Sequence, residues 1–285
     1  MRNAIQYYYG IEVDKITYEK HKYYFDDYIL IPIYKNLDME LYTQTLNLNN
    51  YEIILTKDNN YQTIIDNNNF VLIKRKNNLI NLNFINLSKY AIYIKDKQVI
   101  PWDTLWEQKV DYYEKYIKTL PYSKMKNCFH YYIGMTENAI SLYKMFKQEG
   151  NVYLSHIRLR SDEDYLNPIN YVIDYRSRDL AEYIKKLFFE KRLVMNDIFT
   201  YIASNQYTSY ECILLFIRLL YPSYFFDAYD LIVQGEEENI LDIYIVNMDS
   251  YEFFLNDMYF RLKPYVNLPK IEWLTNKKDL SFDKS

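Results

Sequence analysis

Glycine is almost missing from this chain of 285 residues. The sequence holds four glycines, all isolated: Gly10, Gly134, Gly150 and Gly235. A glycine-rich phosphate-binding loop needs closely spaced glycines, because its backbone turns sharply and brings its N–H groups up to the phosphates. Neither a GxGxxG nor a GxxxxGK[ST] pattern exists here, so the sequence excludes both types of cradle.

Cysteine is also rare, and an excess of basic charge is missing. Cys128 and Cys212 are the two cysteines, and neither forms a CxxC pair or lies near a cluster of histidines. We therefore expect a reducing compartment, the cytoplasm, and no metal site of that kind. The formal net charge of -4 argues against nucleic acid as a partner, since such binding needs a basic face.

Long hydrophobic runs are missing as well. The longest apolar stretch, Cys212 to Phe226, is interrupted by Arg218 and Pro222. It is too short and too polar to span a bilayer, so no membrane insertion is expected. Residues 1–13 lack the apolar core of a secretory signal.

Tyrosine, in contrast, is abundant, with 35 residues. Lysine, asparagine and isoleucine are also frequent, so AT-rich codon usage accounts for the bias. A coat protein that is cross-linked through its tyrosines is the other interpretation, although biased composition alone is weak evidence.

The N-terminal part has the pattern of antiparallel strands separated by turns rich in Asn and Asp. Strands are expected over residues 7–13, 29–34, 51–56, 61–66 and 70–75. Leu37, Leu41 and Leu48 indicate one short helix between the second and third strands. Residues 1–80 are therefore predicted to form a small β-rich lobe.

The pattern then becomes helical, with apolar residues at three- and four-residue steps. Helices are expected over residues 102–120, 133–146, 223–233 and 240–262. Thr208, followed by Glu211, forms a capping box at the start of another helix. Residues 152–174 read as a loop with two short apolar runs. Strands followed by helices predict an α+β protein with a helical second lobe over residues 81–285.

The segment Tyr153 to Ile184 carries most of the candidate chemistry: YLSHIRLRSDEDYLNPINYVIDYRSRDLAEYI. It resembles the aminoglycoside phosphotransferase plan of a His-Gly-Asp loop, an Asn, an apolar strand, Asp-x-Asp and an Asp-Leu-Ala helix start. His156 falls at the His, Asp174 at the first metal-binding Asp, and Asp179-Leu180-Ala181 at the helix start. The resemblance implies a bilobal protein-kinase-like fold, with a small antiparallel-sheet lobe and a larger helical lobe.

Other segments resemble the spore-coat kinase-like proteins of the CotS and YutH type. They are WDTLWEQK from Trp102, YYIGMTENAI from Tyr131, DYRSRDLAEYI from Asp174 and YPSYFF from Tyr221. The resemblance runs from about Trp102 to Phe226 and is looser in the N-terminal lobe. It implies a place in the spore coat if the organism sporulates, with coat or other proteins as partners.

The chain departs from the phosphotransferase pattern at several positions. Arg158 stands where the catalytic Asp is expected, and an arginine cannot act as a base because its pKa stays above about 12. Ile157 replaces the Gly, and Arg176 replaces the second Asp of Asp-x-Asp. Asp174 alone is a poor magnesium site, since Mg²⁺ needs octahedral oxygen ligation.

The candidate site residues therefore form a degenerate set within residues 153–180. His156, Arg158 and Asp174 occupy the catalytic-loop and metal positions, and Asp174 is the metal candidate. His156 is expected to support the loop by hydrogen bonds to the backbone. Glu163 stands at the Asn position, although Asp162 and Asp164 leave the register open.

Lys35 ends an apolar strand, and with Glu163 it is the candidate for nucleotide binding. A lysine at the end of a strand is otherwise a solvated edge charge. A group of arginines either lines an anion-binding cleft or pairs with neighbouring carboxylates: Arg158, Arg160, Arg176 and Arg178.

Three functions are compatible with these features. The first is a non-catalytic kinase-like protein, a pseudokinase, that acts by binding and needs no cofactor. The second is an aminoglycoside- or choline-kinase-like phosphotransferase with a remodelled ATP and Mg²⁺ site, in which Asp162 or Glu163 replaces the base. The third is a scaffold cross-linked through tyrosine. Arg158 at the base position favours the first.

A structural hypothesis accompanies the first function. Arg158 would take the place of the metal and pair with Asp174, which would close the site to Mg²⁺. The alternative is that Arg158 and Arg176 receive an anionic ligand.

Overall fold

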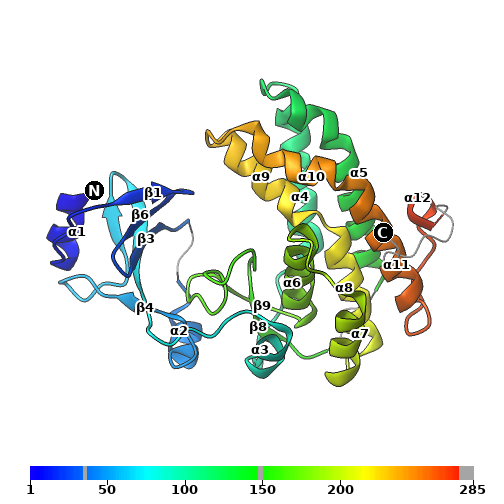
Figure 1. Cartoon of the computed structure of the whole chain (residues 1–285), viewed down its shortest axis with the longest axis horizontal. Helices are drawn as coiled ribbons and strands as arrows, with labels where there is room; N and C mark the ends of the chain where they lie inside the picture. The colour runs from blue at the N-terminus through cyan, green and yellow to red at the C-terminus, as the bar shows by residue number, and fades with distance from the viewer. Residues whose placement is uncertain (35–36, 147–149, 276–285) are drawn as a thin grey trace. The chain divides into compact units, whose positions relative to one another are not determined.

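The computed structural model describes residues 1–34, 37–146 and 150–275 (Figure 1). The chain divides into two units, of which the first comprises Met1–Asn86 and Ser161–Tyr171 and the second Leu87–Arg160 and Val172–Ser285. The first unit runs to Asn86, whereas the first lobe was expected to end at residue 80. Ser161–Tyr171 was expected in the helical lobe, but the structure assigns it to the first unit.

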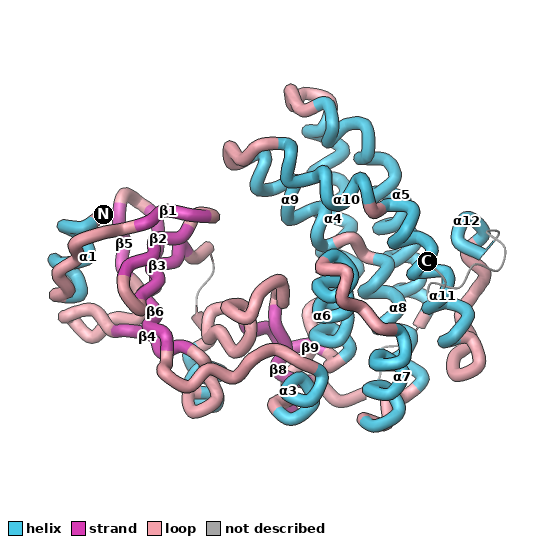
Figure 2. Tube along the Cα trace, viewed as in Figure 1, coloured by secondary structure: helices cyan, strands magenta, loops and turns pink. Residues whose placement is uncertain are grey.

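The first unit is built on an antiparallel sheet (Figure 2). Its strands are β1 (Thr17–Glu19), β2 (Lys22–Phe25), β3 (Tyr28–Pro32), β4 (Tyr51–Ile54), β5 (Thr63–Ile65) and β6 (Asn68–Arg75). Their order is β1-β2-β3-β6-β4, and β5 also pairs with β6. Four expected strands are confirmed with ends within two residues of those predicted, whereas the hairpin β1–β2 was not expected.

The strand expected over residues 7–13 is wrong. Helix α1 (Arg2–Tyr9) occupies the start of the chain and buries Ile5 and Tyr9, which lie four positions apart on one face. Gly10 ends the helix with a left-handed φ of 72°, and its N–H donates to the Gln6 carbonyl. The tyrosine-rich segment resembled a strand because aromatic residues are typical of sheets.

Both faces of the central strands β3 and β6 are buried. One face packs Ile29, Ile31, Val71 and Ile73 against Tyr42 of helix α2 (Met39–Thr45). The opposite face packs Leu30, Phe70 and Leu72 against Ile5 and Tyr9 of α1. Successive residues of a strand point to opposite faces, so a strand covered on both sides reads as a continuous apolar run.

The second unit combines a small sheet with many helices. The sheet has the order β7 (Ile92–Tyr93), β8 (Tyr153–His156), β9 (Tyr171–Asp174). Its helices are α4 (Trp102–Ile117), α5 (Ser123–Met145), α6 (Ser177–Phe189), α7 (Met195–Ser204), α8 (Ser209–Leu220), α9 (Ser223–Val233), η1 (Glu238–Leu241), α10 (Asp242–Val246), α11 (Met248–Leu262) and α12 (Glu272–Thr275). Helix α3 (Phe84–Lys89) spans the division between the units. The two apolar runs expected within a loop form β8 and β9.

Helix α8 is the centre of the second unit, since α5, α6 and α11 all pack against it (Figure 1). The expected capping box at its start is confirmed: the Glu211 N–H donates to Thr208 Oγ1 at 3.2 Å, and the Thr208 N–H donates to Glu211 Oε2 at 2.9 Å. The stretch Ser209–Val233 is long and apolar enough to cross a membrane, but 94% of its most apolar window is buried inside the protein.

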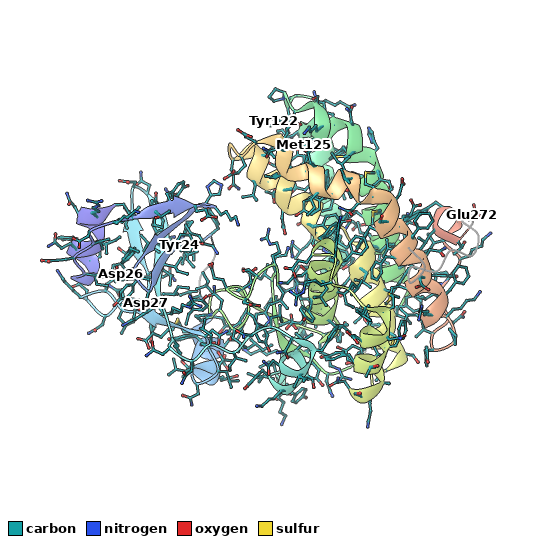
Figure 3. The ribbon with its side chains drawn as sticks, in the orientation of Figure 1. Tyr24, Asp26, Asp27, Tyr122, Met125 and Glu272 are labelled. Carbon is teal, nitrogen blue, oxygen red and sulfur yellow. The ribbon has the colours of Figure 1, made fainter. Side chains whose placement is uncertain are left out.

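Two of the expected helices have different bounds in the structure. Helix α5 begins at Ser123 instead of residue 133. Its start, where Figure 3 labels Tyr122 and Met125, is held by the Tyr122 hydroxyl donating to the Ile232 carbonyl and the Met125 N–H donating to Glu238. The single helix expected over 240–262 is divided into η1, α10 and α11.

Candidate functional site

The candidate catalytic residues of the second unit lie where its small sheet meets α6. Strands β8 and β9 are neighbours that end at His156 and Asp174, and α6 begins shortly after β9. His156 and Asp174 are both buried. Residues that are far apart in the sequence therefore meet around the first turn of α6.

Asp174 is held between two arginines. Its side chain is completely buried, and its Oδ2 accepts hydrogen bonds from Arg178 Nη1 at 3.0 Å and from Arg218 Nη2. Its Oδ1 accepts the Tyr175 N–H at 2.7 Å. A buried carboxylate is costly unless it is paired and hydrogen-bonded, and these donors supply that pairing.

The hypothesis that Arg158 pairs with Asp174 is wrong. Arg158 instead binds Asp227 of α9 through two hydrogen bonds, from Nε at 2.6 Å and from Nη2 at 3.0 Å. Arg178 and Arg218 occupy the place at Asp174 that was assigned to Arg158. The sequence offers no signal for Arg218 or Asp227, whose positions depend on how the helices pack.

Arg158 and Asp227 shift each other's pKa. Burial would lower the pKa of Arg158, but Asp227 and Glu182 more than compensate and hold it above its ordinary value. Burial would likewise raise the pKa of Asp227, but Arg158 and Arg160 hold it well below its usual range. Asp227 is therefore a very weak base at neutral pH.

The alternative, in which Arg158 and Arg176 together receive an anion, is not supported either. Arg176 binds Glu211, with Nε to Oε1 at 2.5 Å and Nη2 to Oε2 at 2.9 Å. Each of these two arginines thus makes a bidentate ion pair with its own carboxylate.

His156 is fixed by Asp179, the acid at the helix start. The His156 N–H donates to Asp179 Oδ1 at 2.7 Å, and His156 Nδ1 lies 2.8 Å from Asp179 Oδ2. The His156 carbonyl accepts Arg178 Nε at 2.6 Å. The ring nitrogen Nδ1 thus contacts a carboxylate, and these contacts tie β8 to α6.

A second buried ion pair lies one turn further along α6. Lys185 Nζ donates to Glu182 Oε1 at 3.1 Å, to the Tyr221 carbonyl at 3.0 Å and to Ser223 Oγ at 3.0 Å. Burial lowers the pKa of Lys185 to about 8, although Glu182 opposes that shift. Burial would raise the pKa of Glu182, but Lys185, Arg158 and Arg178 lower it to about 2.

Glu163 belongs to the first unit, whereas His156, Arg158 and Asp174 belong to the second. It accepts hydrogen bonds from Lys22 Nζ at 2.7 Å and from the Tyr24 hydroxyl at 3.4 Å. It lines a cavity of about 260 Å³ together with Tyr24, Asp26, Asp27, Arg75 and Asp162, among other residues (Tyr24, Asp26 and Asp27 are labelled in Figure 3). Lys35, the other nucleotide candidate, lies outside the described residues.

The residues around Asp174 do not fit a magnesium ion. One carboxylate oxygen is bound by two cationic guanidinium groups, and the other accepts a backbone N–H. Arg176, at the second metal position, is cationic and paired. Over residues 1–34, 37–146 and 150–275, no group of three or more His, Cys, Asp or Glu residues is placed to hold a metal. Two nearby cations would repel Mg²⁺, which prefers oxygen ligands with negative charge.

Comparison with known proteins places the chain in a family. A family described as "Spore coat putative kinase YutH" matches residues 2–257. The chain belongs to this family. The endospore coat-associated protein YutH of Bacillus subtilis (strain 168) is 27% identical over an alignment of 210 residues, and the match covers 61% of this chain and 61% of that protein. The matched part thus spans less than two thirds of that relative.

Comparison with solved structures shows which fold this chain has. An aminoglycoside phosphotransferase from Alicyclobacillus acidocaldarius subsp. acidocaldarius DSM 446 superposes with a TM-score of 0.52 at 9% identity, covering 93% of this chain and 97% of that one. Spectinomycin phosphotransferase APH(9)-Ia, in complex with ADP and spectinomycin, gives a TM-score of 0.54 at 11% identity, covering 92% and 97%. The expected α+β, kinase-like bilobal fold is confirmed.

Proposed function

We propose that this chain is a non-catalytic member of its family, a pseudokinase of the spore coat that acts by binding. The observation that carries the proposal is the Asp174 carboxylate between Arg178 and Arg218. A working phosphotransferase needs this carboxylate for Mg²⁺, which bridges the phosphates and neutralises their developing charge. Here two guanidinium groups use its Oδ2 instead.

The position of the catalytic base supports the same conclusion. Arg158 cannot accept a proton from an acceptor hydroxyl, and its partner Asp227 has a strongly depressed pKa. Glu163, a candidate replacement, accepts hydrogen bonds from Lys22 and Tyr24. Loss of general-base catalysis alone typically removes about 10²–10⁴-fold of rate. The proposal therefore assigns the chain no nucleotide and no metal cofactor.

The family supports a place of action in the spore coat. The relative from Bacillus subtilis is an endospore coat-associated protein by its name. We place this chain in the same structure, after synthesis in the cytoplasm, with other proteins of the coat as partners. A fluorescent fusion in sporulating cells of the source organism should move to the spore periphery, and an even cytoplasmic distribution in mature spores would contradict this placement.

The catalytic part of the proposal is tested by melting the protein with ATP alone, Mg²⁺ alone and both together. We expect no rise in melting temperature that requires both, and no release of ADP in the presence of aminoglycosides or choline. An active aminoglycoside phosphotransferase serves as the positive control. ATP turnover that requires Mg²⁺ and disappears in Asp174→Asn would show that the chain is an enzyme.

A further inference from the structure

A separate cavity lies within the second unit, beside the buried ion pairs. Its volume is about 150 Å³. Aromatic side chains of Trp102, Trp106 and Tyr221 form part of its lining. Five cationic residues also line it: Lys109, Arg158, Arg178, Lys185 and Arg218. Glu182 is the acid in the lining, and Asp174 is not part of it.

The cations of this cavity outnumber the carboxylates that pair with them. Lys109 pairs with Asp230, Arg158 with Asp227 and Lys185 with Glu182. Arg178 and Arg218, however, share the single carboxylate of Asp174. The lining cations and these partners therefore carry one excess positive charge, which favours a ligand with negative charge in a poorly solvated site.

Arg218 also has unused hydrogen-bonding capacity. It is 5% exposed, and within the described part of the chain its one hydrogen bond runs from Nη2 to Asp174. Its buried Nε and the buried indole Nε1 of Trp102 have no hydrogen-bond partner among the described residues. Buried donors are normally satisfied, so two such donors on residues that line one cavity indicate a missing acceptor.

Two of the arginines lie against the aromatic lining. The Arg178 guanidinium lies 4.3 Å from the centre of the Trp102 ring, and that of Arg218 lies 5.0 Å from it. Trp106 in turn stacks on Tyr221, with ring centres 4.2 Å apart. Stacking on a ring face leaves the N–H groups of a guanidinium, which lie in its plane, available to an acceptor. The three nitrogens of Arg178 already donate to Asp174 and to the backbone carbonyls of His156 and Ile157, so the donor for a ligand is Nε of Arg218.

We propose that this cavity binds a small oxyanion, either free or as the head group of a larger molecule. The excess charge, the unused N–H donors and the aromatic lining suit a phosphate, sulfate or carboxylate group, and the volume admits a ligand of only a few non-hydrogen atoms. The inference rests on the proposed binding function and deepens it, because it gives the chemical class of a ligand.

The test measures melting temperature and heat of binding with inorganic phosphate, sulfate, acetate and phosphoserine. Sodium chloride at matched ionic strength is the reference, and no Mg²⁺ or nucleotide is present. We expect a saturable rise with at least one oxyanion. Binding of phosphoserine as well as phosphate identifies a head-group site, and binding of phosphate without phosphoserine identifies a site for a free ion.

Lys109→Met and Arg218→Gln should each weaken binding at least about tenfold, since each removes a charged donor. Lys109 is partly exposed, so its variant should fold even if Arg218→Gln does not. Lys124→Met is the matched control, because Lys124 also pairs with an aspartate, Asp242, but does not line the cavity. The control should bind like the unmodified protein.

No saturable effect of any oxyanion, or equal weakening in Lys109→Met and Lys124→Met, would overturn the oxyanion site. Such a failure would not bear on catalysis, which is tested separately with ATP and Mg²⁺. Turnover of ATP would overturn the pseudokinase proposal, but it would leave a measured binding of oxyanions valid.

Discussion

Asp174 and Arg178 lie four positions apart, and their buried side chains meet at 3.0 Å. Arg218 approaches the same carboxylate oxygen from α8. In a phosphotransferase this carboxylate faces a metal ion. In this protein the same carboxylate forms an internal salt bridge that joins β9, α6 and α8.

Removal of this carboxylate should destabilise the protein. Asp174→Ala leaves two buried guanidinium groups without their shared partner, and we expect a loss of roughly 3–5 kcal/mol in the free energy of unfolding. Urea denaturation measures the change. The control Asp242→Ala removes an exposed partner of Lys124 and should cost less than about 1 kcal/mol. An unchanged urea midpoint in Asp174→Ala would contradict a structural role for Asp174.

Arg158 should couple energetically to Asp227. Arg158→Ala leaves the partly buried Asp227 carboxylate without its bidentate partner, although Arg160 remains 3.6 Å away, and this should cost roughly 1–3 kcal/mol. In a double-mutant cycle, Arg158→Ala and Asp227→Ala should be far from additive, because the two side chains interact directly. Stabilities that simply add would disprove the pair.

Acid should weaken the fold through Glu182. The pKa of Glu182 in the folded protein is about 2, below its ordinary value of 4.5, so the folded state binds fewer protons than the unfolded state between these values. The stabilisation is therefore complete above pH 4.5 and is lost as the pH falls toward 2. Urea midpoints measured across this range should fall with pH.

The variant Glu182→Gln tests whether this residue is responsible. It should be less stable near neutral pH, since Lys185 loses its carboxylate partner, and its stability should fall less steeply in acid. An acid slope identical to that of the unmodified protein would assign the effect to other carboxylates, such as Asp227.

The two cysteines should be unreactive while the protein is folded. Cys128 and Cys212 are buried, and burial raises the pKa of each thiol to about 11. The thiolate is the reactive form, so a disulfide reagent at pH 8 should label neither cysteine of the native protein quickly and both after unfolding in guanidinium. Rapid labelling of one cysteine in the native state would show that its surroundings open.

The sequence alone predicted those elements that depend on residues close together in the chain. The strands β3 to β6 follow from apolar runs between Asn- and Asp-rich turns, and the start of α8 follows from Thr208 and Glu211. Both depend on residues a few positions apart. The replacement of the catalytic Asp by Arg158 and of the second metal Asp by Arg176 is likewise legible without coordinates, because an arginine is cationic in any environment.

The tertiary structure alone decided which charges meet. Arg218 lies 44 positions from Asp174, and Asp227 lies 69 positions from Arg158, so no periodic pattern relates them. Helix packing around α8 brings these side chains into a buried region, where a charge must find a partner. Several carboxylates in the sequence could have paired with Arg158. The packing of α9 brings Asp227 to it. The helix α1 was missed for the same reason, since only burial of Ile5 and Tyr9 against the sheet distinguishes it from a strand.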